Sequence, residues 1–412
     1  MDLLYDLGIR AYRAAVRLAS IRNKKARLML KGMSKTFKKL RENIDPDSGI
    51  IWMHVASLGE FEQGRPLIEM IKRNSPDAHI VLSFFSPSGY EVRKNYPLVD
   101  TVVYLPFDTA HNASKFLSIL KPKVAIFVKY EFWSNYLLTL KRHGVPTYII
   151  SSIFRPGQRF FKPWGAMFRG TLKCFDRLYV QDEQSRELLH NAGINNVVAC
   201  GDTRFDRVAS VKSNAKQFPI IEKFVENAQF TLVMGSSWEP DEEIVIPYFN
   251  EHPGMKLIIA PHEFDRKRLL ELLGHIGRKT QFYSQATLDE AANFDCLIID
   301  SFGLLSSLYQ YGQAAYIGGG FGHGIHNINE AAVYGIPVIF GPRHEKFLEA
   351  HDLIECGGGF SINSPEQFAE VIDRLTTDAS ALHTAGQVAG QYIESHLGAT
   401  QVIYDDLKHL LK

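Results

Sequence analysis

Short apolar segments alternate with longer, helix-length segments along most of this chain. The first series runs from about residue 50 to residue 200, and a second series begins near Gln229. In order, the apolar segments are IIWMHVAS, AHIVLSFF, DTVVYLP, KVAIFVKY, VPTYIISS, DRLYVQ and NVVACG, then FTLVMGSS, KLIIAP, CLIID, AAYIGG and IPVIFGP. Strands separated by helices are typical of parallel, doubly wound sheets. The pattern therefore predicts an α/β fold with two Rossmann-like domains in tandem.

A polar stretch between the two series predicts where the domains divide. At 412 residues the chain is longer than a single core usually grows, which also favours two domains. We predict a basic N-terminal segment at residues 1–45, a first domain at 46–210, a linker at 211–228 and a second domain at 229–412 that includes the C-terminal helices. Two such domains are expected to hold a ligand between their facing loops, at the carboxyl ends of the strands.

The N-terminal segment has the pattern of an amphipathic helix. Its apolar stripe consists of Leu3, Leu4, Leu7, Ala11, Ala14, Ala15, Leu18 and Ile21. Residues 1–41 also hold twelve of the 46 Lys and Arg residues, against two Asp. An apolar stripe beside a dense basic face is what binding to an anionic membrane surface requires. The alternatives are a helix docked on the first domain and a basic arm for nucleic acid; the stripe favours the membrane, and we expect no nucleic-acid partner.

Composition narrows the class of protein. Hydrophobic residues make up 45% of the chain and charged residues 22%, as in soluble globular proteins. The four cysteines are scattered without CxxC spacing, which argues against disulfides and structural zinc and fits a reducing, cytosolic setting. No apolar run is long enough for a transmembrane helix. No histidines have HExxH spacing, so we expect no catalytic metal.

The segment Tyr316–Pro342 contains the densest candidate chemistry. A short strand enters a loop whose glycines are Gly318, Gly319, Gly320, Gly322 and Gly324. A glycine loop between a strand and a helix favours phosphate binding by backbone N–H groups and the helix N-terminus. Asn327 and Glu330 are three residues apart, so they are expected to share one face of the first helical turn, where a ribose would lie. The alternative is a glycine-rich turn in which Glu330 only complements the helix dipole.

Other polar residues follow the predicted strands. Glu60 follows the first strand and Glu131 the fourth, and each is expected to be either a general base or a partner of a helix dipole. Hydroxyl and N–H groups follow the first strand of the second domain at Gly235, Ser236 and Ser237. The candidate cations for a substrate carboxylate or phosphate are Arg204, His262 and Arg266.

Taken in order, five motifs carry a family resemblance. They are SLGEFEQGRPLIEMIK, KYEFWSNYLLTLKRHGVPTYIISS, GDTRFD, GSSWEPDEE and GGGFGHGIHNINEAAVYGIPVIFGP. The series resembles the Kdo transferases, bacterial lipid A enzymes that use CMP-Kdo as donor. The resemblance implies a GT-B glycosyltransferase without metal or other cofactor, with a lipid A precursor bound by the first domain and the nucleotide-sugar by the second. It also implies a peripheral protein on the cytoplasmic face of the inner membrane, attached through residues 1–41.

The resemblance assigns roles residue by residue. It implies that Glu60 is the catalytic base, that Glu131 is a second carboxylate of the acceptor half, and that Asn327 and Glu330 contact the nucleotide. The expected reaction is a single displacement with inversion at the sugar. The alternatives are another GT-B enzyme that uses a UDP-sugar, as a transferase or an epimerase, and a non-catalytic membrane-peripheral binding protein.

The chain also departs from the family pattern. Pro261-His262-Glu263 stands where the family usually has Pro-Arg-His, so another cation is expected to replace that arginine. Arg204 replaces the family lysine, which keeps the charge but changes its geometry. The family Glu-Pro after the HN motif is Glu330-Ala331.

Overall fold

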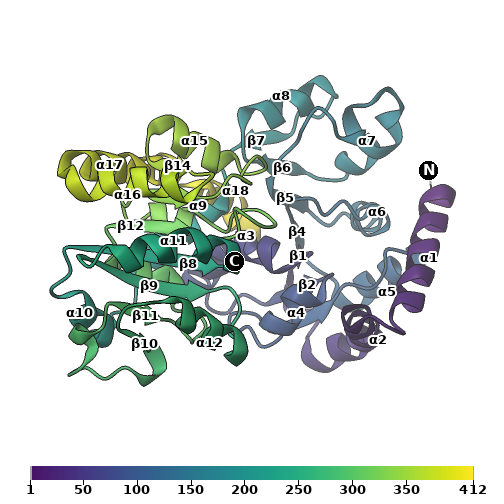
Figure 1. Cartoon of the computed structure of the whole chain (residues 1–412). Helices are drawn as coiled ribbons and strands as arrows, with labels where there is room; N and C mark the ends of the chain where they lie inside the picture. The colour runs from purple at the N-terminus through teal and green to yellow at the C-terminus, as the bar shows by residue number, and fades with distance from the viewer. Residues whose placement is uncertain (1, 412) are drawn as a thin grey trace. The chain divides into compact units, whose positions relative to one another are not determined.

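The chain divides into two compact units, each built around one parallel sheet. The computed structural model describes residues 2–411. Unit 1 comprises the chain up to Arg207 together with the stretch from Leu397 onward, and unit 2 is Val208–His396. Each unit contains a seven-stranded sheet with helices packed around it (Figure 1). This confirms the prediction of an α/β fold with two doubly wound parallel sheets.

The sheet of unit 1 has the strand order β3-β2-β1-β4-β5-β6-β7. Its strands are β1 (Ile51–Val55), β2 (Ile80–Phe84), β3 (Thr101–Tyr104), β4 (Val124–Val128), β5 (Thr147–Ser152), β6 (Arg177–Val180) and β7 (Val197–Ala199). The helices that follow them are α3 (Leu58–Asn74), α4 (Pro87–Arg93), α5 (Ala110–Leu120), α6 (Ser134–Arg142), α7 (Ala166–Leu172), α8 (Glu183–Asn191) and α9 (Thr203–Ser213).

Strand β1 shows why both faces of this sheet are covered. All five of its residues are buried. Ile51 and Met53 belong to the core on one face, whereas Trp52 belongs to the core on the other. Alternate side chains of a strand point to opposite faces, so a strand that is apolar at successive positions requires helices on both sides.

The N-terminal segment forms two helices, α1 (Asp2–Ala19) and α2 (Lys24–Asn43), and α2 packs on β3 (Figure 1). Helix α1 is attached to unit 1 by one face. Ile9 and Val16 pack against a small core cluster, and the Tyr12 ring contacts the rings of Phe85 and Phe107 at 6.3 and 5.8 Å. The stripe predicted from the sequence is not part of this face.

The predicted apolar stripe of α1 is exposed wherever its side chains are described. Leu7 is 61% exposed, and Leu18 and Ile21 are each 71% exposed. The alanines of the stripe, Ala11, Ala14 and Ala15, are exposed as well. The side chains of Leu3 and Leu4 lie outside the described residues. Helix α1 therefore has two apolar faces, of which one packs on unit 1 and the other, which we call the α1 ridge (Leu7, Ala11, Ala14, Ala15, Leu18 and Ile21), does not.

The last helix, α18 (Ala399–Leu411), packs in unit 1, whereas the sequence assigned residues 229–412 to the second domain. Ile403, Leu407 and Leu411 recur at four-residue intervals and join the core beneath the sheet of unit 1. The start of this helix is held by Asp206, whose carboxylate accepts the N–H groups of Gly398 and Thr400 at 2.7 Å each. A four-residue period shows a buried helical face but does not show which sheet covers it.

The sheet of unit 2 has the order β10-β11-β9-β8-β12-β13-β14. Its strands are β8 (Phe230–Ser237), β9 (Met255–Pro261), β10 (Thr280–Phe282), β11 (Cys296–Ile298), β12 (Ala314–Ile317), β13 (Val338–Phe340) and β14 (Gly359–Ser361). Its helices are α10 (Pro219–Val225), α11 (Glu239–Glu251), α12 (Arg266–His275), α13 (Leu305–Leu308), α14 (Asn329–Ala332), α15 (Leu348–Cys356), α16 (Pro365–Thr377) and α17 (Ala379–Ser395). The edge strands β10 and β14 were not predicted, because their sequences, TQF and GFS, are not continuous apolar runs.

The segment predicted as a linker, residues 211–228, is largely helical. Helix α9 continues to Ser213, and α10 covers Pro219–Val225. Ile221 and Phe224 of α10 are both fully buried. Two apolar residues at three-residue spacing were hidden among charged neighbours, which is why the sequence indicated a polar connection here.

Candidate functional site

Glu60 lies in the first turn of α3, just beyond the carboxyl end of β1. Ser57 immediately precedes this helix and donates its hydroxyl hydrogen to Oε2 of Glu60. The Glu60 side chain is half-buried, and its Oε1 accepts no hydrogen bond from the described residues. The arrangement holds one carboxylate oxygen in place and leaves the other to contact a hydroxyl group.

Glu131 lies beyond the carboxyl end of β4, the strand that pairs with β1. The residue is only 8% exposed. Its Oε2 accepts the indole N–H of Trp133 at 2.5 Å and lies 3.0 Å from Nε2 of His54. The structure thus brings both predicted carboxylates to the carboxyl ends of neighbouring strands in unit 1. It adds His54, which the sequence analysis missed.

Left-handed backbone conformations also occur at these strand ends. Lys129, directly after β4, has φ 65°, and Ser151, in the last part of β5, has φ 52°. In unit 2 the corresponding residue is Ser236, near the end of β8, with φ 54°. Such conformations strain residues other than glycine, and they are often retained where function depends on the backbone path. They support the assignment of these strand ends to the functional sites of the two units.

Arg204 is held by an acidic neighbour. Its Nε donates to Oδ2 of Asp202 at 2.8 Å, and its backbone N–H donates to Oδ1 at 2.9 Å. Asp202 is 4% exposed and also accepts the side-chain amide of Gln63. The Arg204 side chain remains 28% exposed. The predicted cation is therefore fixed in direction by a buried carboxylate, which sequence reasoning did not identify.

Tight backbone contacts explain several glycines of unit 2. A Cβ atom on Gly318 would lie 2.3 Å from the carbonyl oxygen of Ser236, and one on Gly320 would lie 2.6 Å from the backbone of Gly341. A Cβ atom on Gly235 would lie 2.0 Å from the hydroxyl oxygen of Tyr309. These glycines are required by packing at the ends of β8, β12 and β13. Their presence alone does not indicate a ligand.

The predicted phosphate cradle needs correction, because two of its N–H groups already have protein acceptors. The N–H of Gly318 donates to the carbonyl of Gly235 at 2.9 Å. The N–H of Gly319 donates to the carboxylate of Asp241 at 2.8 Å. Asp241 is 1% exposed, and this burial raises its pKa above the usual range. These two N–H groups are therefore not available to a phosphate, and the acidic side chain beneath the loop disfavours an anion at this point.

The pair Asn327 and Glu330 is partly as predicted. Nδ2 of Asn327 donates to Oε1 of Glu330 at 3.0 Å, which confirms that the two side chains are adjacent. The helix, however, is α14, which begins at Asn329 and has only four residues. So short a helix provides little dipole for an anion. The amide and the carboxylate are placed together by the turn rather than by one face of a long helix.

A stack of rings lies at the carboxyl ends of β8 and β9. His262 lies 4.6 Å from Trp238 in a stacked arrangement and 4.6 Å from His326. The indole N–H of Trp238 donates to Nε2 of His326 at 3.3 Å. Burial, and then the proximity of His262, lower the pKa of His326 to about 4, so this ring is neutral at pH 7. His262 was predicted, whereas Trp238 and His326 were not assigned roles in the stack.

Two other predicted polar side chains of unit 2 are available to a ligand. The Ser236 hydroxyl and the Arg266 guanidinium have no hydrogen-bond or ion-pair partner among the described residues. Ser237 differs, because its hydroxyl donates to the buried carboxylate of Glu242 at 2.8 Å. Ser236 and Arg266 are therefore better candidates for substrate contacts than Ser237.

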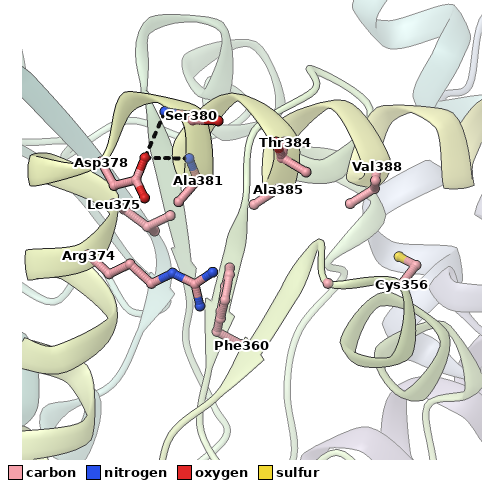
Figure 2. Close-up of a pocket in the computed structure, with 11 residues that line it drawn as sticks. Cys356, Phe360, Arg374, Leu375, Asp378, Ser380, Ala381, Thr384, Ala385 and Val388 are labelled. Carbon is pink, nitrogen blue, oxygen red and sulfur yellow. Dashed lines mark hydrogen bonds between the residues drawn. The ribbon is translucent and has the colours of Figure 1, made fainter.

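A separate cavity of unit 2, of about 400 Å³, contains none of the predicted site residues. Figure 2 shows Arg374 and Phe360 directed into it, with Cys356 at one side and the start of α17 above. Asp378 caps α17 by accepting the N–H groups of Ser380 and Ala381. This cavity lies at the beginning of β14, not at the carboxyl ends of the central strands.

Two further features are absent from the described residues. Residues 2–411 contain no group of three or more His, Cys, Asp or Glu side chains positioned to hold a metal ion. Among the helices described in the structure, none is both long and apolar enough to cross a membrane.

The comparison with solved structures defines the class of fold. The UDP-GlcNAc 2-epimerase from Neisseria meningitidis matches 87% of this chain and all of its own, with a TM-score of 0.61 and 14% identity. A putative UDP-N-acetylglucosamine 2-epimerase from Listeria monocytogenes gives a TM-score of 0.60 over 88% of this chain and 96% of its own, at 13% identity. Identities this low show the fold alone. The chain has the GT-B fold of two Rossmann-like units.

Sequence comparison then shows the family to which the chain is similar. Residues 22–207 match the family model for 3-deoxy-D-manno-octulosonic-acid transferase (kdotransferase). The transferase of that name from Aquifex aeolicus is 26% identical over 366 residues, covering 86% of this chain and 94% of its own length. That from Chlamydia muridarum is 26% identical over 362 residues, covering 82% and 80%. The chain is therefore similar to the Kdo transferases over most of its length, and this similarity supports a glycosyltransferase.

Proposed function

We propose that this protein transfers Kdo from CMP-Kdo to a hydroxyl group of a lipid A precursor. The observation that carries the proposal is the placement of Glu60 and Glu131 at the carboxyl ends of the paired strands β1 and β4. Both residues lie within the segment that matches the transferase family. Polar residues at that end of a doubly wound sheet are the usual site of ligand contact.

Glu60 is proposed to act as the general base. Its Oε1 accepts the proton of the acceptor hydroxyl while the hydroxyl oxygen bonds to the anomeric carbon of Kdo. The bond from that carbon to the CMP phosphate breaks, and CMP leaves with the electron pair. The reaction is then a single displacement with inversion. Ser57 holds Oε2 by a hydrogen bond, which limits the rotation of the carboxylate.

Unit 2 is proposed to bind the CMP part of the donor. Asn327 and Glu330 would contact the ribose, supported by the hydrogen bond that holds them together. The Ser236 hydroxyl, the exposed ring of His262 and Arg266 would contact the phosphate or the sugar carboxylate. Gly235, Ser237, Gly319 and Gly320 would shape this site by their backbone packing rather than by N–H contacts. Arg204 of unit 1 would contact the Kdo carboxylate.

The nucleotide that the protein binds distinguishes this proposal from the alternative, an enzyme of the same fold that uses a UDP-sugar. Thermal unfolding of the purified protein would be measured with CMP, UMP and UDP at equal concentrations. At equal concentrations, the ligand that binds the native state more tightly raises the unfolding temperature more. We expect CMP to give the largest shift, and Asn327→Ala and Glu330→Gln to reduce it. A larger shift with UDP would instead support a UDP-sugar enzyme.

We further propose that residues 1–41 hold the protein on the cytoplasmic face of the bacterial inner membrane as a peripheral protein. The exposed α1 ridge supplies an apolar surface, and Leu18 alone is 71% exposed. A cavity of about 370 Å³ lies beside it between α1 and α2. Arg13 and Arg17 line this cavity together with the apolar side chains of Leu30 and Phe37. Apolar contacts next to two exposed arginines fit an anionic lipid surface.

A further inference from the structure

His54 is a buried histidine in β1, an interior strand of the sheet of unit 1, with a hydrogen-bonding group at each ring nitrogen. It is fully buried. Nε2 lies 3.0 Å from Oε2 of Glu131, whereas Nδ1 lies 2.9 Å from the hydroxyl oxygen of Ser83 and 3.1 Å from its carbonyl oxygen. Ser83 pairs with His54 in the register of β1 and β2. The contacts therefore follow from the register of three adjacent strands.

The contacts at Glu131 determine which ring nitrogen carries a proton. An ionised carboxylate only accepts hydrogen bonds, so Nε2 of His54 must donate to it. Trp133 donates to the same oxygen at 2.5 Å, which leaves Oε2 with two N–H donors. Oε1 of Glu131 has no hydrogen-bond donor among the described residues. One oxygen of the carboxylate is thus fixed inside the unit, while the other remains to contact a ligand.

The other side of the ring is consistent with a proton on Nε2. The indole N–H of Trp52 donates to the hydroxyl oxygen of Ser83 at 2.8 Å. The Ser83 hydroxyl can then donate to Nδ1 of His54, which satisfies every group in the series with a neutral ring. If the ring takes up a second proton, Nδ1 can donate to the Ser83 carbonyl instead, and the Ser83 hydroxyl can turn to the carbonyl of Met53 at 3.4 Å. Nε2 is protonated in both states.

We propose that His54 is a positioning residue for Glu131. Its Nε2–H and the Trp133 indole hold Oε2, keep the carboxylate ionised and direct Oε1 towards the acceptor substrate. The rings packed around His54 are those of Trp52, Phe127 and Trp133, which carry no charge. Glu131 supplies the charged side chain that is hydrogen-bonded to His54. The role in turnover rests on the proposed function of this site, whereas the hydrogen bond itself does not.

Two substitutions of His54 separate positioning from simple packing. In His54→Gln the amide N–H₂ can take the place of Nε2–H, whereas in His54→Asn the shorter side chain reaches the Ser83 side only. Kdo transfer to a lipid A precursor would be measured across pH for both variants. We expect H54N to lower kcat about tenfold or more with a smaller change in KM. Loss of a donor favours the protonated carboxylate, so its acid limb should move to higher pH.

H54Q should retain more of the activity and an unshifted acid limb, even if both variants lose similar thermal stability. Equal losses of activity in the two variants, with no displacement of the pH profile, would overturn the positioning role.

A ¹⁵N NMR spectrum of histidine-labelled wild type provides a test that needs no turnover. We expect a proton on Nε2 of His54 at every pH at which the protein is folded. A neutral ring protonated only on Nδ1 would overturn the hydrogen bond to Glu131. If the wild type is inactive with CMP-Kdo, the proposed function is contradicted. The NMR spectrum would still show whether His54 donates a hydrogen bond to Glu131.

Discussion

The phenol of Tyr5, on the first helix, donates a 2.6 Å hydrogen bond to the carboxylate of Asp108, which is fully buried in unit 1. The same carboxylate accepts the backbone N–H groups of Asn135 and Tyr136 at the start of α6, each at 3.0 Å. Asn135 also donates from its side chain to Asp6. These bonds attach α1 to the interior of unit 1 by the face opposite to the α1 ridge. The ridge is thereby presented outward.

Asp108 makes the stability of unit 1 depend on pH. Burial raises its pKa to about 6, although the three hydrogen bonds act in the opposite direction. In the unfolded chain an aspartate has a pKa of about 3.9. A pKa raised by folding means that the contribution of Asp108 is fully present below about pH 4 and is lost as the pH rises through 6. The expected loss is about 2–3 kcal/mol.

This expectation is tested by the unfolding free energy of wild type and Asp108→Asn between pH 4 and pH 7.5. The amide does not titrate, so the advantage of wild type over the variant should shrink as the pH rises. Asp77→Asn, at an exposed position of the same unit, controls for the loss of a carboxylate. A constant difference between wild type and D108N across this range would contradict the assignment.

The α1 ridge predicts binding to anionic vesicles. Leu7→Gln combined with Leu18→Gln removes two exposed apolar side chains from it. Each leucine that enters the membrane interface contributes roughly 1–2 kcal/mol, so the double variant should bind vesicles about thirtyfold to a thousandfold more weakly. The measurement is co-sedimentation with vesicles containing phosphatidylglycerol. Leu270→Gln with Leu288→Gln, both exposed in unit 2, is the matched control and should bind as wild type does.

The charge of the lipid provides a second test of membrane binding by residues 1–41. Arg13→Gln with Arg17→Gln should weaken binding to the same vesicles and leave the weak binding to neutral vesicles unchanged. If the variant of the α1 ridge and its control bind anionic vesicles equally well, the α1 ridge does not attach the protein to membranes. Strong, salt-dependent retention on DNA by wild type would favour the alternative of a nucleic-acid arm.

The close packing of the glycine loop predicts a position-specific loss of stability. Gly318→Ala places a Cβ atom 2.3 Å from the Ser236 carbonyl oxygen, which requires the backbone to move. The expected cost is about 2–4 kcal/mol in the unfolding of unit 2. In Gly322→Ala the new Cβ has an ordinary contact of 3.6 Å with Gly319, so the change should be small. Similar unfolding midpoints in urea for the two variants would show that the loop is not closely packed.

The sequence predicted those features that depend on local pattern. Apolar runs located the longer strands. The position of Glu60 after the first of them correctly placed this residue beyond the carboxyl end of β1. Contacts between distant segments were not predictable in this way. His54 lies in an apolar run and meets Glu131 only because β1 and β4 are paired. Nothing in the local pattern around Gly319 indicates that its N–H is taken by Asp241, 78 residues earlier.

The N-terminal segment shows a second feature that the sequence pattern alone does not predict. The leucine stripe lies on helix α1, but the sequence pattern did not indicate that this face is left exposed. Tyr5, Ile9 and Val16 supply the packing face, and they are spaced as regularly as the stripe. Periodicity identifies apolar faces of a helix, whereas the neighbouring elements decide which of them is buried.

The most direct test of the account is mass spectrometry of a lipid A precursor after incubation with the protein and CMP-Kdo. Wild type should increase the mass of the lipid by at least one Kdo residue and release CMP. Glu60→Gln should lower the initial rate by about a hundredfold or more, as expected for removal of a general base. Glu183→Gln, the same change in the first turn of α8, should have little effect. Unmodified lipid with wild type, or Kdo transfer by E60Q at the wild-type rate, would contradict the central claim.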